Sequence, residues 1–396
     1  MPANNSTASM QVCESCKATV PVHAVYCPSC GNTLKKKPAK KKKKMDPLVG
    51  TILDHKYRLV KKIGEGGMAL IYRAEHIFLK EWRAIKIIKK PDQRRETQYG
   101  RFLREARLAR KVSALSPHVI RIDDFGYDQK KGMYYYSMEL LEGKTLREAL
   151  RKRPPYLKPA HLLYVSAQVC KAMDIAHQNG MIHRDLKPDN IYLITQEGYE
   201  DFVKIIDFGL ARPLSPEEPQ YTDVGKVVGT PEYMSPEQCR GPSPEQRMRN
   251  QSCVDARSDV YSLGVIMYQC LAGRVPFSLE GEPNPQNFLK LMSNQISKSP
   301  KPLRKVRPET PREVAAIIEK AMQKDPKKRF QTMYEMQRAI MQLLPDTVRL
   351  PESARLPKTS DTPVIELTNF LRPTTDNLPA LDFSRFKVQL DPELKF

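Results

Sequence analysis

The sequence contains no long apolar run, no secretory leader pattern and no internal repeat. Its longest apolar stretch, Val260–Ala272, is interrupted by Tyr, Ser and Gln and is shorter than the roughly 20 residues that span a membrane. The first 30 residues lack the basic-then-apolar order of a secretory signal. These absences argue against secreted, collagenous and membrane-spanning classes and predict a cytoplasmic protein without a membrane span. A length of 396 residues with 40% hydrophobic composition allows two or three domains with a large core.

Positive charge is in excess and is partly concentrated in one segment. The net charge is +21, and the run Lys35–Lys44 contains eight lysines. Such a block repels itself and stays extended, so we predict a lysine-rich linker over residues 34–56. The run either attracts nucleic acid or an anionic surface by counterion release or is a solubilising linker, and no interleaved aromatic side chains are present to stack on bases.

Both ends of the chain lack sustained periodicity. Residues 1–11 are small and polar, which predicts a disordered terminus. Residues 345–396 include seven prolines, which predicts a flexible tail.

Four of the eight cysteines form two C-x-x-C pairs, Cys13 with Cys16 and Cys27 with Cys30. Residues 12–33 have too few large apolar side chains for a core of their own, so a metal must stabilise the fold. Four thiolates complete a tetrahedral shell, which predicts a structural zinc ribbon. Free thiols in a disordered arm and a redox disulfide pair are the alternatives.

The hydrophobic pattern changes from strands to helices along the chain. Residues 57–63, 84–88 and 133–141 are typical of strands, with a helix predicted at 101–112. Residues 162–176, 260–271 and 314–322 repeat apolar side chains at helical spacing. A strand-rich half therefore precedes a helix-rich half, which is an α+β arrangement.

A glycine cluster, Ile63-Gly64-Glu65-Gly66-Gly67-Met68-Ala69-Leu70-Ile71, lies between two predicted strands. Glycines let backbone N–H groups approach phosphate oxygens closely, but the same pattern is also typical of a simple hairpin. No helix is predicted directly after it, which argues against a dinucleotide-binding site.

Lys86 lies within an apolar strand pattern, so its ammonium group needs an anion or must reach solvent. Glu105, on the next predicted helix, could be a carboxylate partner. Each residue taken alone could equally be a surface charge.

The most specific motif is His183-Arg-Asp185-Leu-Lys187-Pro-Asp-Asn190, followed 17 residues after Asn190 by Asp207-Phe-Gly. With the glycine cluster and Lys86, this ordered set resembles the eukaryotic-type (Hanks-type) Ser/Thr protein kinases, especially their bacterial branch. The resemblance covers about residues 57–344. It implies a two-lobed kinase fold, with an antiparallel sheet plus one helix in the N-lobe and a mainly helical C-lobe.

The resemblance implies a role for each charged residue. Lys86 would contact the α- and β-phosphates of ATP and pair with Glu105, while Lys187 would steady the γ-phosphate. Asp185 would accept or orient the proton of the substrate hydroxyl. The ligands of Mg²⁺ (or Mn²⁺) would be Asn190 and Asp207.

The resemblance also implies a nucleotide pocket, with a hinge that bonds the adenine edge. Its lining residues would be Ile63, Gly64, Gly66, Gly67, Ala69, Ile71, Ala84, Met138, Glu139, Leu141 and Tyr192. Ala69 stands where a third glycine is usual, and Tyr192 stands where an aliphatic residue is more common. Both departures affect the expected nucleotide affinity and not the reaction type.

Residues 229–237, Gly-Thr-Pro-Glu-Tyr-Met-Ser-Pro-Glu, resemble the end of a kinase activation segment. Thr230 would line the substrate-hydroxyl site and, with Lys187, favour Ser/Thr substrates. By the same resemblance Glu237 pairs with Arg329. Thr222 is the first candidate for phosphorylation in this segment, and an unmodified segment is the alternative.

The motifs also imply a support for the catalytic loop and a function for the chain. Asp259 is expected to brace the catalytic loop. The predicted function is phosphorylation of protein substrates by ATP, with a nucleotide-binding pseudokinase scaffold and a nucleic-acid-binding module as the rival classes.

Overall fold

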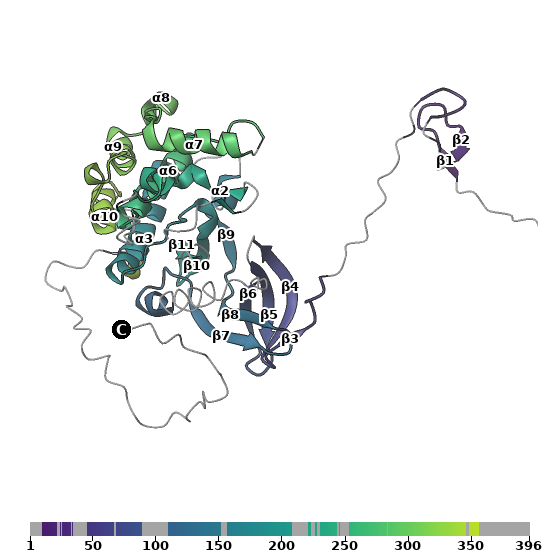
Figure 1. Ribbon diagram of the computed structural model, residues 1–396, viewed down its shortest axis with the longest axis horizontal. Coiled ribbons are helices and arrows are strands. Elements are labelled where there is room, and N and C mark those ends of the chain that lie inside the picture. The colour runs from purple at the N-terminus through teal and green to yellow at the C-terminus, as the bar shows by residue number, and fades with distance from the viewer. Residues whose placement is uncertain are drawn as a thin grey trace, which may run out of the picture. The chain divides into compact units, whose positions relative to one another are not determined.

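The computed structural model describes residues 10–21, 24, 26–32, 34, 46–66, 69–88, 110–151, 157–207, 221–222, 226–227, 230–243, 245, 253–282, 284–345 and 348–355. The chain divides into two compact units (Figure 1). We call the described residues 46–88 and 122–141 the sheet unit, and those from 110–121 and 142–355 the helical unit. Residues 10–34 form a small separate element, described below with its cysteines.

The sheet unit is a six-stranded antiparallel sheet in the order β3-β4-β5-β6-β8-β7. Its strands are β3 (Ile52–Leu53), β4 (Tyr57–Glu65), β5 (Ala69–His76), β6 (Glu81–Ile88), β7 (Ile122–Asp128) and β8 (Met133–Glu139). The strand predictions at residues 57–63, 84–88 and 133–141 coincide with β4, β6 and β8.

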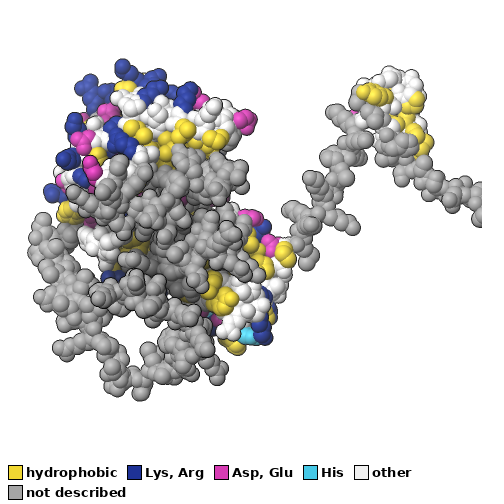
Figure 2. Space-filling model, in the orientation of Figure 1, with side chains coloured by type: hydrophobic (Ala, Val, Ile, Leu, Met, Phe, Trp, Pro, Cys, Tyr) yellow, Lys and Arg dark blue, Asp and Glu magenta, His cyan; other side chains and the backbone are white. Residues whose placement is uncertain are grey.

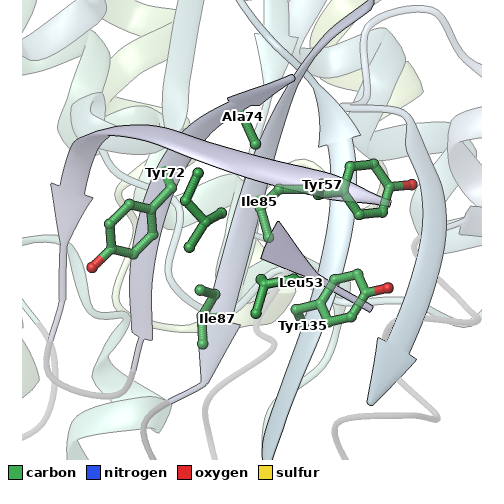
Figure 3. Close-up of a cluster of buried hydrophobic side chains, with 8 residues drawn as sticks. Leu53, Tyr57, Tyr72, Ala74, Ile85, Ile87 and Tyr135 are labelled. Atoms are coloured by element: carbon green, nitrogen blue, oxygen red, sulfur yellow. The ribbon is translucent and has the colours of Figure 1, made fainter. Parts of the chain in front are cut away.

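One face of this sheet is covered by a cluster of buried side chains (Figure 3). Tyr72 lies opposite Ile85 in the β5–β6 register, and Tyr57 packs edge-on against Tyr135 with ring centroids 5.7 Å apart. Because side chains alternate between faces along a strand, residues one position away point to the opposite face. Lys86, next to Ile85, is therefore on that opposite face.

The folded sheet extends before the predicted domain boundary at residue 57. Ile52 pairs with Arg58 in the β3–β4 register, and the hydroxyl of Tyr72 donates to the Asp46 carboxylate at 2.9 Å. Residues 46–56, placed in the lysine-rich linker by composition, contribute a strand and a hydrogen-bond acceptor to the sheet unit. A strand of two residues is too short to show an alternating pattern, so periodicity could not predict β3.

The described part of the helical unit contains a three-stranded sheet, a two-stranded sheet and a set of helices. The three-stranded sheet has the order β11-β10-β9, with β9 (Gly143–Thr145), β10 (Ile191–Gln196) and β11 (Tyr199–Ile205); β12 (Tyr221–Thr222) and β13 (Lys226–Val227) pair separately. The α-helices are α2 (Leu146–Leu150), α3 (Pro159–Gln178), α4 (Pro236–Arg240), α6 (Ala256–Ala272), α7 (Pro285–Ser297), α8 (Leu303–Val306), α9 (Arg312–Ala321) and α10 (Met333–Met341). Short 3₁₀ helices are η1 (Pro188–Asn190), η2 (Pro231–Tyr233), η3 (Pro326–Lys328) and η4 (Glu352–Ala354).

Helices α3 and α6 are largely buried, as their apolar spacing predicts. Pro159 begins α3 at a position where its missing N–H is tolerated, and α6 begins after Asp255, whose side chain accepts from the Arg257 N–H. At Gly264 in α6 a Cβ would lie 2.9 Å from the Cβ of Ala321. This glycine therefore allows α6 and α9 to pack closely.

The helical unit also extends beyond the predicted boundary at residue 344. Residues 348–355 include η4 and bury Leu350 and Ala354. The predicted flexible tail therefore begins with a segment that is packed, and residues 356–396 lie outside the described residues.

The described surface has a basic end. Figure 2 shows Lys and Arg side chains over α8 and α9, and Lys298, Lys301, Arg304 and Lys305 are exposed there. Among the described residues, no helix is both long and apolar enough to cross a bilayer.

Candidate active site

The described residues of the glycine cluster lie at the ends of strands β4 and β5, which pair as antiparallel neighbours. Gly64 lies opposite Ile71 in the register, and the Gly66 N–H donates to the Ala69 carbonyl at 2.9 Å. Ile63, at an irregularity in the β4–β5 register, is half exposed. This hairpin is consistent both with a phosphate-binding loop and with a simple turn between two strands. Gly67 lies outside the described residues.

Four predicted site residues share the face of the sheet opposite the buried cluster. Ile71 pairs with Lys86, and Ala84 pairs with Met138; residues directly opposite each other in antiparallel strands point to the same face. The Lys86 ammonium lies 5.7 Å from the ring centroid of Tyr136 on the neighbouring strand. The sheet therefore presents a cation between apolar side chains, as a nucleotide phosphate and base would require.

The predicted hinge follows at the end of β8. Glu139 pairs with Arg83, and Leu141 comes two residues later; both side chains are half-buried. Glu139 is thus the last residue of an internal strand, and Leu141 lies just beyond the end of that strand.

The catalytic-loop residues are held together in the helical unit. The Lys187 ammonium lies 2.8 Å from the Asp185 carboxylate, and the Asn190 side-chain N–H donates to the Asp185 carbonyl at 2.8 Å. Both charged side chains are only about one-quarter exposed or less, at 20% and 25%. A carboxylate, an ammonium and an amide therefore lie next to one another, as the motif predicts.

Asp259 on α6 binds the backbone of the catalytic loop. Its carboxylate accepts from the backbone N–H groups of His183 and Arg184, each at 2.9 Å, and lies 2.8 Å from Nε2 of His177. Burial alone would raise the pKa of Asp259, but these partners, His177 first, lower it. A fully buried anion thus holds Arg184, whose φ of +64° is unusual for a non-glycine residue.

Asp207 lies two residues after the end of β11 and has a φ of +54°. Its neighbour Ile206 donates its N–H to the Asn190 carbonyl at 3.0 Å, and the Ile206 carbonyl lies 3.0 Å from Nε2 of His183. The two predicted metal ligands, Asn190 and Asp207, are therefore brought to adjacent backbone positions.

Tyr192 lies on β10, opposite Lys204 of β11 and Thr145 of β9. Its side chain is half-buried, and burial raises the pKa of its hydroxyl. An aromatic ring at this position is consistent with a pocket floor.

The segment that includes Thr230 is anchored to several helices. Thr230 precedes η2 and is half-buried. Gln295 on α7, fully buried, donates to the carbonyls of Pro231 and Glu232 at 3.2 and 2.7 Å. The predicted pair of Glu237 and Arg329 is confirmed, with two N–O distances of 2.8 Å.

Sequence reasoning missed several residues that hold this site in place. Gln238 donates to the Arg184 carbonyl at 2.7 Å, and Arg147 pairs with Asp189 at 2.9 Å. Gln295 and His177 were also missed. For Gln295 and His177 the sequence shows only a polar residue within a helical pattern. Such a pattern does not indicate which residue the polar side chain contacts.

Some predicted features lie outside the described residues. These are Glu105, Gly67, the lysine run, and most of the helix predicted at 101–112, of which residues 110–112 are described as helical. The side chain of Thr222 is likewise not described. The roles suggested for them, including contact of the lysine run with nucleic acid or an anionic surface, stay predictions.

The model of the protein kinase domain family matches residues 57–341. This chain belongs to the protein kinase family. The match begins at β4 and ends at the last residue of α10, so it includes strands β4 to β8 of the sheet unit and most of the helical unit.

Two curated relatives illustrate the similarity of this kinase chain. It is 35% identical over 305 residues to Serine/threonine-protein kinase Pkn1 of Myxococcus xanthus, which is 77% of this chain and 40% of the relative. It is also 35% identical over 290 residues to Serine/threonine-protein kinase PrkC of Bacillus subtilis, which is 73% of this chain and 41% of the relative. The chain thus spans less than half the length of these relatives.

A solved structure confirms the two-lobed fold. The PknI kinase domain of Mycobacterium tuberculosis aligns with a TM-score of 0.53 and 22% identity, over 74% of this chain and 98% of that domain. At this level of identity the likeness concerns the fold, with its antiparallel sheet and its helical lobe.

The four amino-terminal cysteines lie outside the kinase match but are brought together. Strands β1 (Met10–Val12) and β2 (Thr19–Pro21) pair beside them, and the four Sγ atoms all lie within 4.8 Å of one another. Cys13 and Cys30 are 3.7 Å apart, and Cys16 and Cys27 are 3.5 Å apart. Tetrahedral zinc with bonds of about 2.3 Å requires sulfur separations of about 3.8 Å, so the donor set fits this metal.

The backbone around these thiols favours the thiolate form at two of them. The N–H of Cys16 lowers the pKa of the Cys13 thiol. At Cys27 burial opposes ionisation, but the N–H groups of Ser29 and Cys30 lower the pKa to about 6. These are the forms that a metal would bind.

Proposed function

We propose that this chain is a serine/threonine protein kinase, which transfers the γ-phosphoryl group of ATP to Ser and Thr hydroxyls of proteins, including its own activation segment. The observation that supports this most directly is the catalytic-loop geometry: Lys187 lies 2.8 Å from the Asp185 carboxylate, and Asn190 bonds the Asp185 backbone. The names of the relatives point to the same substrate class.

Asp185 is the proposed proton acceptor. As the substrate oxygen forms its bond to the γ-phosphorus, the bond from that phosphorus to the bridging oxygen of ADP breaks, and the hydroxyl proton moves to the Asp185 carboxylate. Lys187 supplies positive charge beside the transferred group. Thr230, held by the anchored η2 segment, positions the incoming hydroxyl.

On the sheet unit, Lys86 is proposed to bind the α- and β-phosphates, with Glu105 as its carboxylate partner. Ile71, Ala84 and Met138 share its face and would pack on the adenine ring. The backbone of the glycine hairpin, of Glu139 and of Leu141 supplies hydrogen-bonding groups.

The proposed metal ligands are Asn190 and Asp207. Bound Mg²⁺ (or Mn²⁺) would neutralise charge on the phosphate oxygens. The backbone hydrogen bond of 3.0 Å from the Ile206 N–H to the Asn190 carbonyl supports this proposal, because it ties the residue before Asp207 to Asn190.

The amino-terminal cysteines are proposed to hold a structural zinc ion. Four protein ligands would leave no open coordination position, so the site is expected to stabilise the fold and not to catalyse a reaction.

The test of the kinase proposal is phosphoryl transfer by Asp185→Ala. We expect purified protein with labelled ATP and Mg²⁺ to label Ser and Thr residues, and the variant to lose at least about a hundredfold in rate, since proton transfer and positioning are both removed. Glu280→Gln is the control, because Glu280 is a surface carboxylate paired with Lys290 at 2.7 Å. Peptide mapping of the same reaction would show whether Thr222 is modified.

Equal labelling by Asp185→Ala and the unchanged protein would contradict the proposal. Nucleotide binding with no transfer by either protein would instead favour the pseudokinase class.

A further inference from the structure

Residues 348–355, which we call the 348–355 strap, attach to the helical unit after α10. Leu350 and Ala354 are buried, at 5% and 0% exposure. The side-chain amide of Gln337 on α10 donates to the Ala354 carbonyl at 2.7 Å and to the Ala167 carbonyl of α3 at 3.2 Å. One buried amide thus joins the strap to both helices.

The strap also reaches His118, a fully buried histidine in the segment that follows the helical residues 110–115. The ring of His118 stacks on Phe202 of β11, with centroids 4.3 Å apart. Its Nδ1 lies 3.0 Å from the Val203 carbonyl, and its Nε2 lies 2.9 Å from the hydroxyl oxygen of Ser353 in the strap.

These contacts determine which nitrogen of His118 has the proton. A carbonyl can only accept a hydrogen bond, so Nδ1 must be the donor to Val203. Burial lowers the pKa of His118 to about 4, with Lys204 and Lys171 acting in the same direction, so the ring is neutral near pH 7. Nε2 is then an acceptor, and the Ser353 hydroxyl donates to it.

Backbone hydrogen bonds connect the segment around His118 with the end of β11, which precedes the predicted metal ligand Asp207. The Ile205 N–H donates to the His118 carbonyl at 2.7 Å, and the Ile120 N–H donates to the Ile205 carbonyl at 2.9 Å. Residues 118–120 therefore bind along the end of β11. Two residues further along the chain is Asp207, with Ile206 bonded to Asn190.

We propose that Ser353 is a positioning residue: through His118 it keeps residues 118–120 bonded to the end of β11, and so holds Asp207 where it can bind the metal with Asn190. The 348–355 strap thereby couples the segment after the catalytic domain to metal–nucleotide binding. This inference rests on the proposed function, because it takes Asp207 to be the metal ligand.

The test uses Ser353→Ala in the full chain. Removing the hydroxyl leaves Nε2 of His118 as a buried acceptor without its donor, which should favour local opening of the 118–120 contact. We expect the amides of Ile120 and Ile205 to exchange about tenfold faster, a change of the size expected for one buried hydrogen bond. The Mg²⁺ concentration for half-maximal transfer should rise by a similar factor, about tenfold, while the rate at saturating Mg²⁺ changes little.

Two control variants separate positioning from general destabilisation. Ser353→Thr keeps the hydroxyl and should restore the Mg²⁺ dependence and the exchange rates. Glu352→Gln changes the neighbouring exposed side chain, which is 87% exposed, and should match the unchanged protein in both measurements.

Unchanged exchange at Ile120 and Ile205 in Ser353→Ala would overturn the inference, as would faster exchange with an unaltered Mg²⁺ requirement. If no variant, nor the unchanged protein, transfers phosphate, the proposed function fails instead. The positioning of Asp207 would then be tested by binding of Mn²⁺ alone, and equal affinity in Ser353→Ala and the unchanged protein would overturn it.

Discussion

At the scale of single residues, the site depends on buried charges with several partners each. Asp259 bonds two backbone N–H groups of the catalytic loop, and Arg329, with a fully buried side chain, pairs with Glu237. An ion buried in this way stabilises the fold only while its partner is present. Such residues therefore give sharp mutational tests.

Glu237→Gln should destabilise the helical unit strongly. It leaves the Arg329 guanidinium buried without its counterion, so the loss in unfolding free energy should be about 3 kcal/mol. Glu280→Gln, at an exposed and solvent-screened pair, should leave the unfolding free energy nearly unchanged. Denaturant unfolding measures both, and equal small losses would contradict a structural role for the buried pair.

The same pair predicts a dependence on pH. Burial opposes ionisation of Glu237, but its bonds with Arg329 lower its pKa below the ordinary value of 4.5. A carboxyl whose folded-state pKa is lowered stabilises the protein above the unfolded-state pKa and loses that contribution as pH falls through the folded-state pKa. The stability difference between Glu237→Gln and the unchanged protein should therefore shrink below about pH 4.5.

At the scale of elements, the packing of the helices depends on how closely they approach each other as well as on their apolar patterns. The helices predicted at residues 162–176, 260–271 and 314–322 are confirmed as parts of α3, α6 and α9. Their contacts were not predictable, because periodicity identifies a buried face but not its partner. Gly264 illustrates this, since nothing in the local sequence shows that Ala321 lies against it.

Gly264→Ala should destabilise the protein although alanine is the better helix former. Its Cβ would lie 2.9 Å from both the Ala321 Cβ and the Met322 Cγ, so α6 and α9 must separate, at about 1–3 kcal/mol. Thermal unfolding measures the loss. Adding Ala321→Gly should recover part of it, and a more stable Gly264→Ala protein would contradict the close packing.

The candidate site was predictable where a motif specifies neighbours along the chain. Asp185, Lys187 and Asn190 lie together because six consecutive residues of one loop contain them all. The residues that hold this loop in place were missed, because they contact it from distant parts of the sequence. They are Gln238, His177 and the pair of Arg147 with Asp189. The strand at 52–53 and the 348–355 strap were missed because short pairings and isolated buried residues leave no periodic signal.

At the scale of the whole molecule, each unit contributes its own set of the residues proposed for the kinase reaction. The sheet unit provides Lys86 and the apolar face around it, and the helical unit provides Asp185, Asn190 and Asp207. The cysteine cluster is outside the matched kinase residues 57–341. The metal of the cluster and the chemistry of the kinase should therefore be separable.

Removing zinc should unfold residues 10–34 and leave phosphoryl transfer intact. Elemental analysis should find one zinc per chain, and Cys13→Ser should release it and expose this segment to proteolysis, because the metal replaces a core. Cys253→Ser, outside the cluster, is the matched control. Full zinc retention in Cys13→Ser would exclude the four-thiolate site.

We propose that Lys86 and Asp207 act on the same nucleotide, and a double-mutant cycle of transfer rates with Lys86→Met and Asp207→Asn is the experiment that tests this. Residues that act together on one triphosphate give losses in kcat/KM that do not add. If Lys86 and Asp207 act on the same nucleotide, the double variant should be scarcely slower than the worse single variant. Fully additive losses would contradict it, because they would mean that the two side chains act independently.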